Sequence, residues 1–250
     1  MSTETEHAST LDPDEVARFA AIADEWWDPT GKFRPLHKIG PARLQFFRQE
    51  ICRHFGRDES SNEALNGLSL IDIGCGGGLV AEPMAKQGAT VTAIDPAENN
   101  IKAAQVHADA QNLQIDYKAC RAEDMVESGE TFDIVFCLEV VEHVPNVQDF
   151  VALIAKLVAP GGVMILSTIN RTTKSFALAI VGAEYVLRWL PKGTHQWSRF
   201  VTPDELKKCV EHAGLQPRDT AGLVFSPLRN SWSISNDCDV NYFLTASKTP

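Results

Sequence analysis

The sequence predicts an α/β fold, a doubly wound and mostly parallel sheet of seven strands, from three observations. Short apolar runs typical of strands alternate with amphipathic stretches, an order that gives parallel strands with right-handed crossover helices. The first of these runs, residues 69–73, ends in glycines, as a buried strand does when it turns into a helix. The 250 residues, 44% of them hydrophobic, are enough for one large domain with a full core.

Composition excludes several classes of protein. The formal net charge of −10 argues against a general nucleic-acid-binding protein, which would carry a basic surface. No apolar run reaches the roughly 20 residues needed to span a bilayer. Residues 1–10 are polar and include acids, unlike a signal or transit peptide. The six cysteines are scattered without zinc spacing, which indicates reduced thiols in a cytosolic protein.

Residues 1–67 are expected to hold a disordered start and two helices that cap a ligand site. Asp12 is the predicted N-cap of the first helix, and Pro13 lies in its first turn. Apolar residues at helical spacing then run to Trp26 and Trp27. Core packing would account for both tryptophans, and so would a lid over a cofactor or an aromatic substrate.

A second helix is expected to begin at Gly40-Pro41, because proline favours the first helical turn. Its apolar stripe includes Phe47, whereas Arg43 falls outside that stripe. The guanidinium of Arg43 is thus left either in solvent or in reach of a ligand carboxylate. Residues 57–67 are polar and form a linker into the central domain, residues 68–250.

A glycine-rich turn follows the first predicted strand. It runs Asp72-Ile73-Gly74-Cys75-Gly76-Gly77-Gly78 and leads into a helix expected over residues 79–87, in which Pro83 is unexpected. Gly74, Gly76 and Gly78 have no Cβ, so the backbone there can pass close to a ligand. The helix presents free backbone N–H groups to the same place. The turn therefore predicts a binding site for a nucleoside-like ligand.

The second strand, expected over residues 90–94, ends in Asp95. An acid about 20 residues after the first glycine of such a turn is where a nucleoside ribose is held. A dinucleotide-binding turn would need a third glycine where Leu79 stands, so an NAD(P)-dependent oxidoreductase is a disfavoured alternative. With Asp72 and Asp95 in these places, the stretch resembles motif I of the class I S-adenosylmethionine-dependent methyltransferases.

The rest of the chain continues the alternation of strands and helices. Strands are expected over residues 115–119, 132–137, 163–168 and 242–247, and helices over residues 97–111, 147–158 and 203–213. Pro160-Gly161-Gly162 is expected to turn the chain into the strand at 163–168. Residues 221–239 show no pattern that can be assigned.

A second group of polar residues follows the strand at 132–137, at the sheet edge where open α/β folds bind ligands. Glu139, Glu142 and His143 have the spacing i, i+3, i+4, which would place them on one face of a helical turn. Such a group can hold Mg²⁺. Alternatively, His143 acts as a general base on a phenolic hydroxyl while a glutamate orients the ring. A solvated helix face without function is the third possibility.

Six segments, in order, resemble the ubiquinone-biosynthesis O-methyltransferases, the bacterial and mitochondrial enzymes that methylate polyprenyl catechol and phenol intermediates. They are Trp26-Trp27-Asp28, Phe33-Arg34-Pro35-Leu36-His37, Pro41-Ala42-Arg43-Leu44, Asp72 to Gly78, Glu139 to Val144 and Gly182-Ala183-Glu184-Tyr185. The resemblance covers about residues 14–215 and implies a Rossmann-like class I methyltransferase fold. It also implies that one protein performs both O-methylation steps of the pathway.

The resemblance carries expectations for individual residues. It implies that Arg43, Gly74, Asp95 and Leu138 contact S-adenosylmethionine, together with the rest of the glycine turn. In the mitochondrial branch of the family, the positions of Glu139, Glu142 and His143 hold a magnesium ion. The implied partners are a polyprenyl phenol or catechol substrate and other ubiquinone-biosynthesis proteins, with no nucleic acid.

An apolar insert separates the strand at 163–168 from the helix at 203–213. Residues 176–190 are apolar almost throughout, and residues 170–200 contain five basic residues against one acid, Glu184. Such a segment predicts contact with anionic membrane lipid through about residues 171–199, in a cytoplasmic protein peripheral to the bacterial inner membrane. A buried helix over the active site, or a dimer contact, would also account for it.

Two further functions stay open at this point. The first is a non-catalytic, membrane-associated scaffold that binds S-adenosylmethionine, in which the insert matters and the group at 139–143 does not. The second is a methyltransferase that acts on another small phenol or lipid, because motif I is shared by many methyltransferases.

Overall fold

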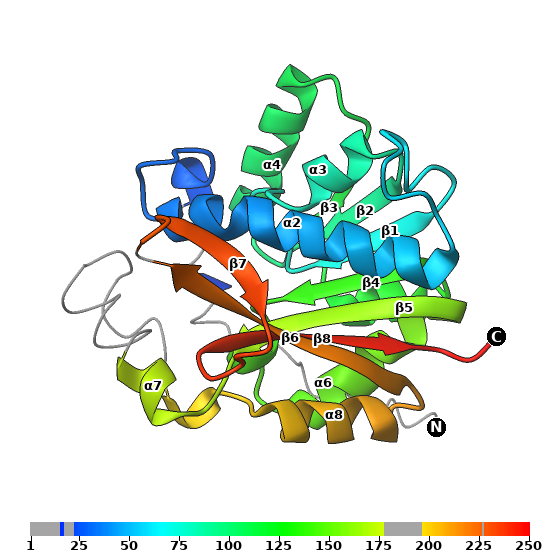
Figure 1. Cartoon of the computed structure of the whole chain (residues 1–250). Helices are drawn as coiled ribbons and strands as arrows, with labels where there is room; N and C mark the ends of the chain where they lie inside the picture. Colours follow the sequence, from blue (N-terminus) through cyan, green and yellow to red (C-terminus); the bar gives the residue numbers. More distant parts are fainter. Residues whose placement is uncertain (1–15, 18–22, 178–196, 227) are drawn as a thin grey trace.

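The computed structural model describes residues 16–17, 23–177, 197–226 and 228–250. Within them the chain forms one eight-stranded sheet in the order β3-β2-β1-β4-β5-β8-β6-β7 (Figure 1). The strands are Ser69–Ile73 (β1), Thr90–Ile94 (β2), Asp116–Lys118 (β3), Phe132–Leu138 (β4), Val158–Ile169 (β5), Gln216–Ser226 (β6), Ser231–Ser235 (β7) and Asn241–Ser247 (β8). The α-helices are Arg34–Phe55 (α2), Ala81–Lys86 (α3), Glu98–Ala110 (α4), Ala122–Glu127 (α5), Val147–Ile154 (α6), Thr173–Ser175 (α7) and Pro203–His212 (α8).

The sheet has a parallel half and an antiparallel half. Strands β3, β2, β1, β4 and β5 pair in parallel, as the alternation of strands and helices predicts. β8 pairs antiparallel with β5 and β6, and β7 pairs antiparallel with β6. The expected α/β fold is confirmed, but the expected number of seven strands is wrong. Neither β6 nor β7 was assigned from the sequence, because they lie in or beside residues 221–239, where no pattern was found, and they pair with each other through contacts such as the ring pair of Phe225 and Trp232.

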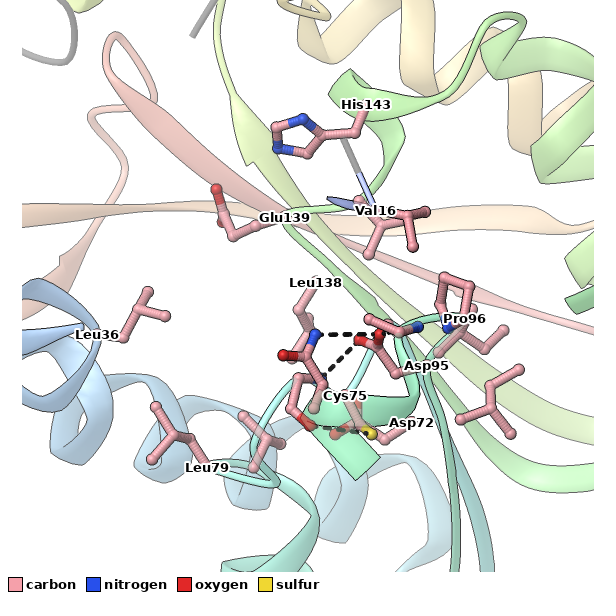
Figure 2. Close-up of a pocket in the computed structure, with 18 of the residues that line it drawn as sticks. Val16, Leu36, Asp72, Cys75, Leu79, Asp95, Pro96, Leu138, Glu139 and His143 are labelled. Carbon is pink, nitrogen blue, oxygen red and sulfur yellow. Dashed lines mark hydrogen bonds between the residues drawn. The ribbon is translucent and has the colours of Figure 1, made fainter. Parts of the chain in front are cut away.

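The parallel half brings the ends of three strands, β1, β2 and β4, to one edge. The glycine turn follows β1, Asp95 follows β2, and Glu139 follows β4. These segments border a pocket at the carboxyl ends of the strands (Figure 2). None of the helices within the described ranges is long and apolar enough to cross a membrane.

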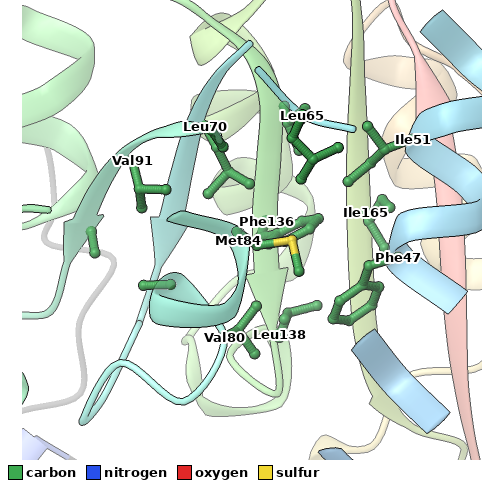
Figure 3. Close-up of a cluster of buried hydrophobic side chains, with 14 of the residues drawn as sticks. Phe47, Ile51, Leu65, Leu70, Val80, Met84, Val91, Phe136, Leu138 and Ile165 are labelled. Atoms are coloured by element: carbon green, nitrogen blue, oxygen red, sulfur yellow. The ribbon is translucent and has the colours of Figure 1, made fainter. Parts of the chain in front are cut away.

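Helices cover both faces of the sheet. On one face, α2 and α3 pack against β1, β4 and β5, with Phe47, Met84 and Phe136 at the centre (Figure 3). On the other face, α6 and α8 pack through residues such as Ile154 and Leu206. All five of these side chains are fully buried, so the core holds the sheet edge that carries the pocket in place.

The start of α2 differs from the sequence prediction. The helix begins at Arg34, with Pro35 in its first turn, and Gly40-Pro41 lies inside it. A proline inside a helix removes a backbone hydrogen bond and costs about 3 kcal/mol. Leu36 and Ile39, which precede Pro41, pack against buried clusters, and burial of such apolar side chains offsets that loss. Tertiary packing therefore sets the length of α2.

Two other proline-containing segments also differ from expectation. α3 begins at Ala81, so Pro83 is its third residue, where the backbone N–H would have no partner within the helix. Pro160-Gly161-Gly162 does not form a separate turn before the strand, because β5 already begins at Val158. Gly161 has φ of +75° there, next to an irregularity in the pairing of β4 with β5.

Candidate active site

The pocket is a cavity of about 270 Å³ with a mainly apolar lining (Figure 2). It brings together nine of the ten residues predicted for the site: Arg43, Asp72, Gly74, Gly76, Asp95, Leu138, Glu139, Glu142 and His143. Gly78 does not line it. Gly78 has φ of +84°, and a Cβ there would lie 2.2 Å from the hydroxyl oxygen of Tyr117, so its requirement for glycine is structural.

The glycine turn is held against the end of β2. The backbone N–H groups of Gly74 and Cys75 both donate to the carbonyl oxygen of Ile94, at 2.8 and 3.0 Å. Gly74 and Gly76 have φ of +73° and +54°, a region that favours glycine. A Cβ on Gly74 would lie 2.5 Å from a methyl carbon of Val140, which leaves no room for a side chain.

Asp95 links the ends of β1 and β2. Its Oδ2 accepts the N–H of Gly76 at 3.0 Å, and its Oδ1 accepts the N–H of Ala97 at 2.9 Å and the side-chain amide of Asn100 at 3.1 Å. Burial raises the pKa of this carboxyl, and the three hydrogen bonds oppose that rise. Asp95 thus has a fixed orientation and still lines the cavity.

Arg43 enters the same cavity from α2. Its side chain is buried, so the alternative that placed it in solvent is wrong. Its Nε makes no hydrogen bond to the described residues, although the charges of Asp72 and Glu139 lie nearby. Burial raises the pKa of Asp72 to about 7, with Arg43 opposing the rise and Asp95 adding to it. A buried guanidinium with an unused donor can bind a ligand carboxylate.

The segment after β4 does not have the predicted conformation. Glu139 has φ of +56°, and a 3₁₀ turn, Val141–His143, begins only after it. The prediction of one helical face for Glu139, Glu142 and His143 is therefore wrong. Ser167 donates its hydroxyl to Glu139 at 2.7 Å, and Thr168 donates to Glu142 at 2.8 Å. The position of each glutamate is set by β5 and not by a helix.

Glu142 lies in a strongly perturbed environment. Burial raises the pKa of this carboxyl to about 7, the negative charge of Glu139 adds to the rise, and His143 opposes it. A carboxyl with such a pKa can hold or release a proton near neutral pH. Because it interacts electrostatically with an imidazole at the same end of the cavity, the pair suits proton transfer.

The residues at this end do not fit a metal centre. Across the described ranges, no group of three His, Cys, Asp or Glu side chains is placed to hold a metal ion. Glu139 and Glu142 each accept a hydrogen bond from β5 instead. His143 and Glu139 lie toward one end of the pocket, and Asp72 and Asp95 lie toward the other (Figure 2). The roles of Glu139, Glu142 and His143 are therefore considered without a metal ion.

Two features of the pocket were missed or left open. Asn100, which holds Asp95, was missed, although a buried asparagine one turn after a ligand-binding acid is itself a signal. Trp26 lines the cavity and covers Gly76 and Gly77, whose Cβ atoms would lie 2.4 Å from its indole and side-chain carbons. Trp26 also packs in a small buried cluster with Ala23 and Phe33, so both alternatives given for it, core packing and a lid, agree with the structure. The predicted first helix lies largely outside the described residues, and Ala23–Glu25 form a 3₁₀ turn.

Comparison with known proteins gives consistent matches. A model of the methyltransferase-domain family matches residues 41–220. The ubiquinone biosynthesis O-methyltransferase of Rhizobium leguminosarum bv. trifolii (strain WSM2304) is 54% identical over 241 residues, which cover 96% of each chain. That of Azorhizobium caulinodans is 55% identical over 236 residues, covering 94% of this chain and 93% of its own.

Solved structures support the fold. The plantazolicin methyltransferase BpumL, in complex with a desmethylplantazolicin analogue and SAH, has a TM-score of 0.64 at 15% identity, covering 95% of this chain and 97% of its own. Magnesium protoporphyrin IX methyltransferase from Synechocystis, with bound SAH, has a TM-score of 0.60 at 19% identity, covering 92% of this chain and 100% of its own. At these low sequence identities, the two structures support the fold alone.

Proposed function

This chain belongs to the ubiquinone biosynthesis O-methyltransferases, and we propose that its cavity transfers a methyl group from S-adenosylmethionine to the phenolic hydroxyl of a polyprenyl phenol or catechol. Relatives that are 54% and 55% identical over nearly the whole chain support the activity. The observation that carries the proposal is the cavity itself, which joins the glycine turn and Asp95 to the group at Glu139–His143.

The donor end of the cavity, formed by the glycine turn, Arg43 and Asp95, fits S-adenosylmethionine. Gly74 and Gly76 of the glycine turn line the cavity and would contact the methionine part, and the Nε of Arg43, which has no hydrogen-bond partner among the described residues, suits its carboxylate. Asp95 would accept the ribose hydroxyls, and Leu138 would contact the donor from the end of β4. When bound, S-adenosylmethionine supplies a methyl group on a positively charged sulfur.

The acceptor end, formed by Glu139, Glu142 and His143, would activate the phenol. His143 would take the phenolic proton on a ring nitrogen, since a phenol is a poor nucleophile until it is deprotonated. The carboxyl group of Glu142 would stabilise the imidazolium that forms, because the two groups interact electrostatically. Alignment of the phenolate with the methyl group is the other large contribution to the rate.

A long isoprenoid substrate favours contact with a membrane, which we assign to about residues 171–199. Residues 178–196, with most of the apolar insert, lie outside the described residues. At the described edges of the insert, Phe176 is 46% exposed and Trp197 is 41% exposed. Two of the basic residues form ion pairs, Arg171 with Glu205 and Lys174 with Asp237 and Asp239, so apolar contact would contribute more than charge.

The test is methyl transfer from labelled S-adenosylmethionine to short-chain polyprenyl phenol and demethylubiquinol, with and without a chelator. We expect both acceptors to be methylated, as both O-methylation steps require, and the chelator to have little effect. Loss of transfer in chelator and its recovery with Mg²⁺ would support a metal held by Glu139, Glu142 and His143 instead. No transfer to either acceptor by protein that binds S-adenosylhomocysteine would refute the proposed substrate.

A further inference from the structure

A ring stack outside the cavity holds the cap segment, residues 23–33, against the glycine turn. The indole of Trp27 lies parallel to the imidazole of His107, with ring centroids 3.5 Å apart and planes 3° apart. The Nε1 of Trp27 donates to the carbonyl oxygen of Gly77 at 2.9 Å. Trp27 therefore connects α4 to the turn. His107 itself does not line the cavity.

The orientation of His107 is fixed by α3. Its Nδ1 donates to Oε1 of Glu82 at 2.7 Å, and the side chain of Glu82 is only 1% exposed. A buried carboxylate needs such a partner, and the ammonium group of Lys86 lies 3.9 Å from Oε2 of Glu82. Glu82 belongs to α3, the helix that follows the glycine turn. The orientation of the imidazole is therefore tied to the position of that turn.

The stack also bears on the residue next to Trp27. Trp26 lines the cavity, stacks on Phe33 at 3.6 Å, and donates from Nε1 to Oδ1 of Asn100 at 2.9 Å. Asn100 in turn donates to Asp95 at 3.1 Å. A continuous set of contacts thus runs from His107 through both tryptophans to the carboxylate at the donor end.

We propose that His107 is a positioning residue for the methyl donor. Paired with Glu82, it provides the ring on which Trp27 stacks, and so holds Trp26 over Gly76 and Gly77 where the donor binds. The proposal rests on the function proposed above, in which that end of the cavity takes S-adenosylmethionine. The expected effect is on donor affinity and not on the chemical step, because His107 lies outside the cavity and does not approach the Glu139–His143 end.

The first test compares His107→Ala with Val106→Ala, a matched control on the same helix at a side chain that is 71% exposed. Replacing His107 should raise the Kd of S-adenosylhomocysteine, measured by calorimetry, and the KM of S-adenosylmethionine by about tenfold each, with kcat nearly unchanged. The control should match the parent protein. Hydrogen exchange should become faster in residues 23–33 and stay the same in α4.

A double-mutant cycle separates positioning from a loss of folding. Trp27→Ala removes the same stack from the cap segment and should weaken binding to a similar degree. The double variant should be little worse than either single variant, because the two side chains act as one unit. Additive losses, or an unchanged Kd in Trp27→Ala, would overturn the proposal. Failure of the parent protein to bind S-adenosylhomocysteine would instead overturn the proposed function.

Discussion

The two ends of the cavity are built in different ways. At the donor end, Asp95 is held by N–H groups of Gly76 and Ala97, and so by short segments that directly follow β1 and β2. At the acceptor end, Glu139 and Glu142 are held by hydroxyls of β5, which come 28 and 26 residues later in the chain. Asp95 is thus held by segments next to its own strand, whereas Glu139 and Glu142 depend on the pairing of β4 with β5.

The carboxyl groups at the two ends also lie in different electrostatic environments. Asp95 accepts three hydrogen bonds, which stabilise its charged form against burial. Glu142 is fully buried with the negative charge of Glu139 beside it, and its pKa rises to about 7. Asp95 at the donor end is therefore held by fixed hydrogen bonds, whereas Glu142 at the acceptor end can exchange a proton near neutral pH.

The largest expected effect comes from Glu142→Ala. Removing the carboxyl should lower kcat by roughly 100-fold or more, because His143 loses the partner that stabilises its protonated form. The Kd of S-adenosylhomocysteine should stay within about twofold of the parent value, since Glu142 does not belong to the donor end. Steady-state kinetics and calorimetry measure the two quantities. Glu130→Ala, at an exposed residue, is the control.

Full activity in Glu142→Ala would mean that the acceptor end is wrongly assigned. A parallel loss of donor affinity would mean that the donor end and the acceptor end are not independent of each other.

The next largest effect is expected from Asp95→Ala. The variant loses the acceptor of the Gly76, Ala97 and Asn100 hydrogen bonds, and the Kd of S-adenosylhomocysteine should rise by roughly 10- to 100-fold. At saturating donor, kcat should fall much less. Asp116→Ala, on β3, is a control because that side chain is 57% exposed. Unchanged affinity in Asp95→Ala would show that the donor end lies elsewhere.

This contrast explains what the sequence could predict. The alternation of parallel strands with helices, the glycine turn and Asp95 follow from patterns within about 25 residues, and the structure places the turn and Asp95 at one sheet edge. The residues after β4 were predicted from helical spacing alone, which cannot reveal that Glu139 has a positive φ. That conformation depends on hydroxyls of β5, whose position is set by long-range pairing of the strands.

A similar reason applies to α2 and to the cap segment. Pro41 favoured a helix start, but the packing of Leu36 and Ile39 against buried clusters favours a helix that already begins at Arg34. The contact of Trp27 with His107 joins residues 80 positions apart in the chain, and no local pattern predicts it. Sequence reasoning identified the chemistry-bearing residues and did not identify the contacts that orient them.

The last expected effect is on stability and not on catalysis, and it concerns Asp72, a second buried carboxyl at the donor end. Burial raises the pKa of Asp72 to about 7, whereas an aspartate in an unfolded chain titrates near 3.8. Between these two values the folded protein binds a proton that the unfolded chain has released. The free energy of unfolding should therefore fall as pH rises from about 4 to 7, by at most roughly 4 kcal/mol, because each pKa unit corresponds to about 1.4 kcal/mol.

Asp72→Asn should remove this dependence, because asparagine has nearly the same shape and does not titrate. Urea unfolding of the parent and the variant at pH 5 and pH 7.5, without ligand, measures the difference. The parent should lose more stability between the two pH values than the variant does. Equal losses would mean that Arg43 holds Asp72 ionised, and the donor end would then carry two fixed carboxylates, Asp72 and Asp95, in place of one.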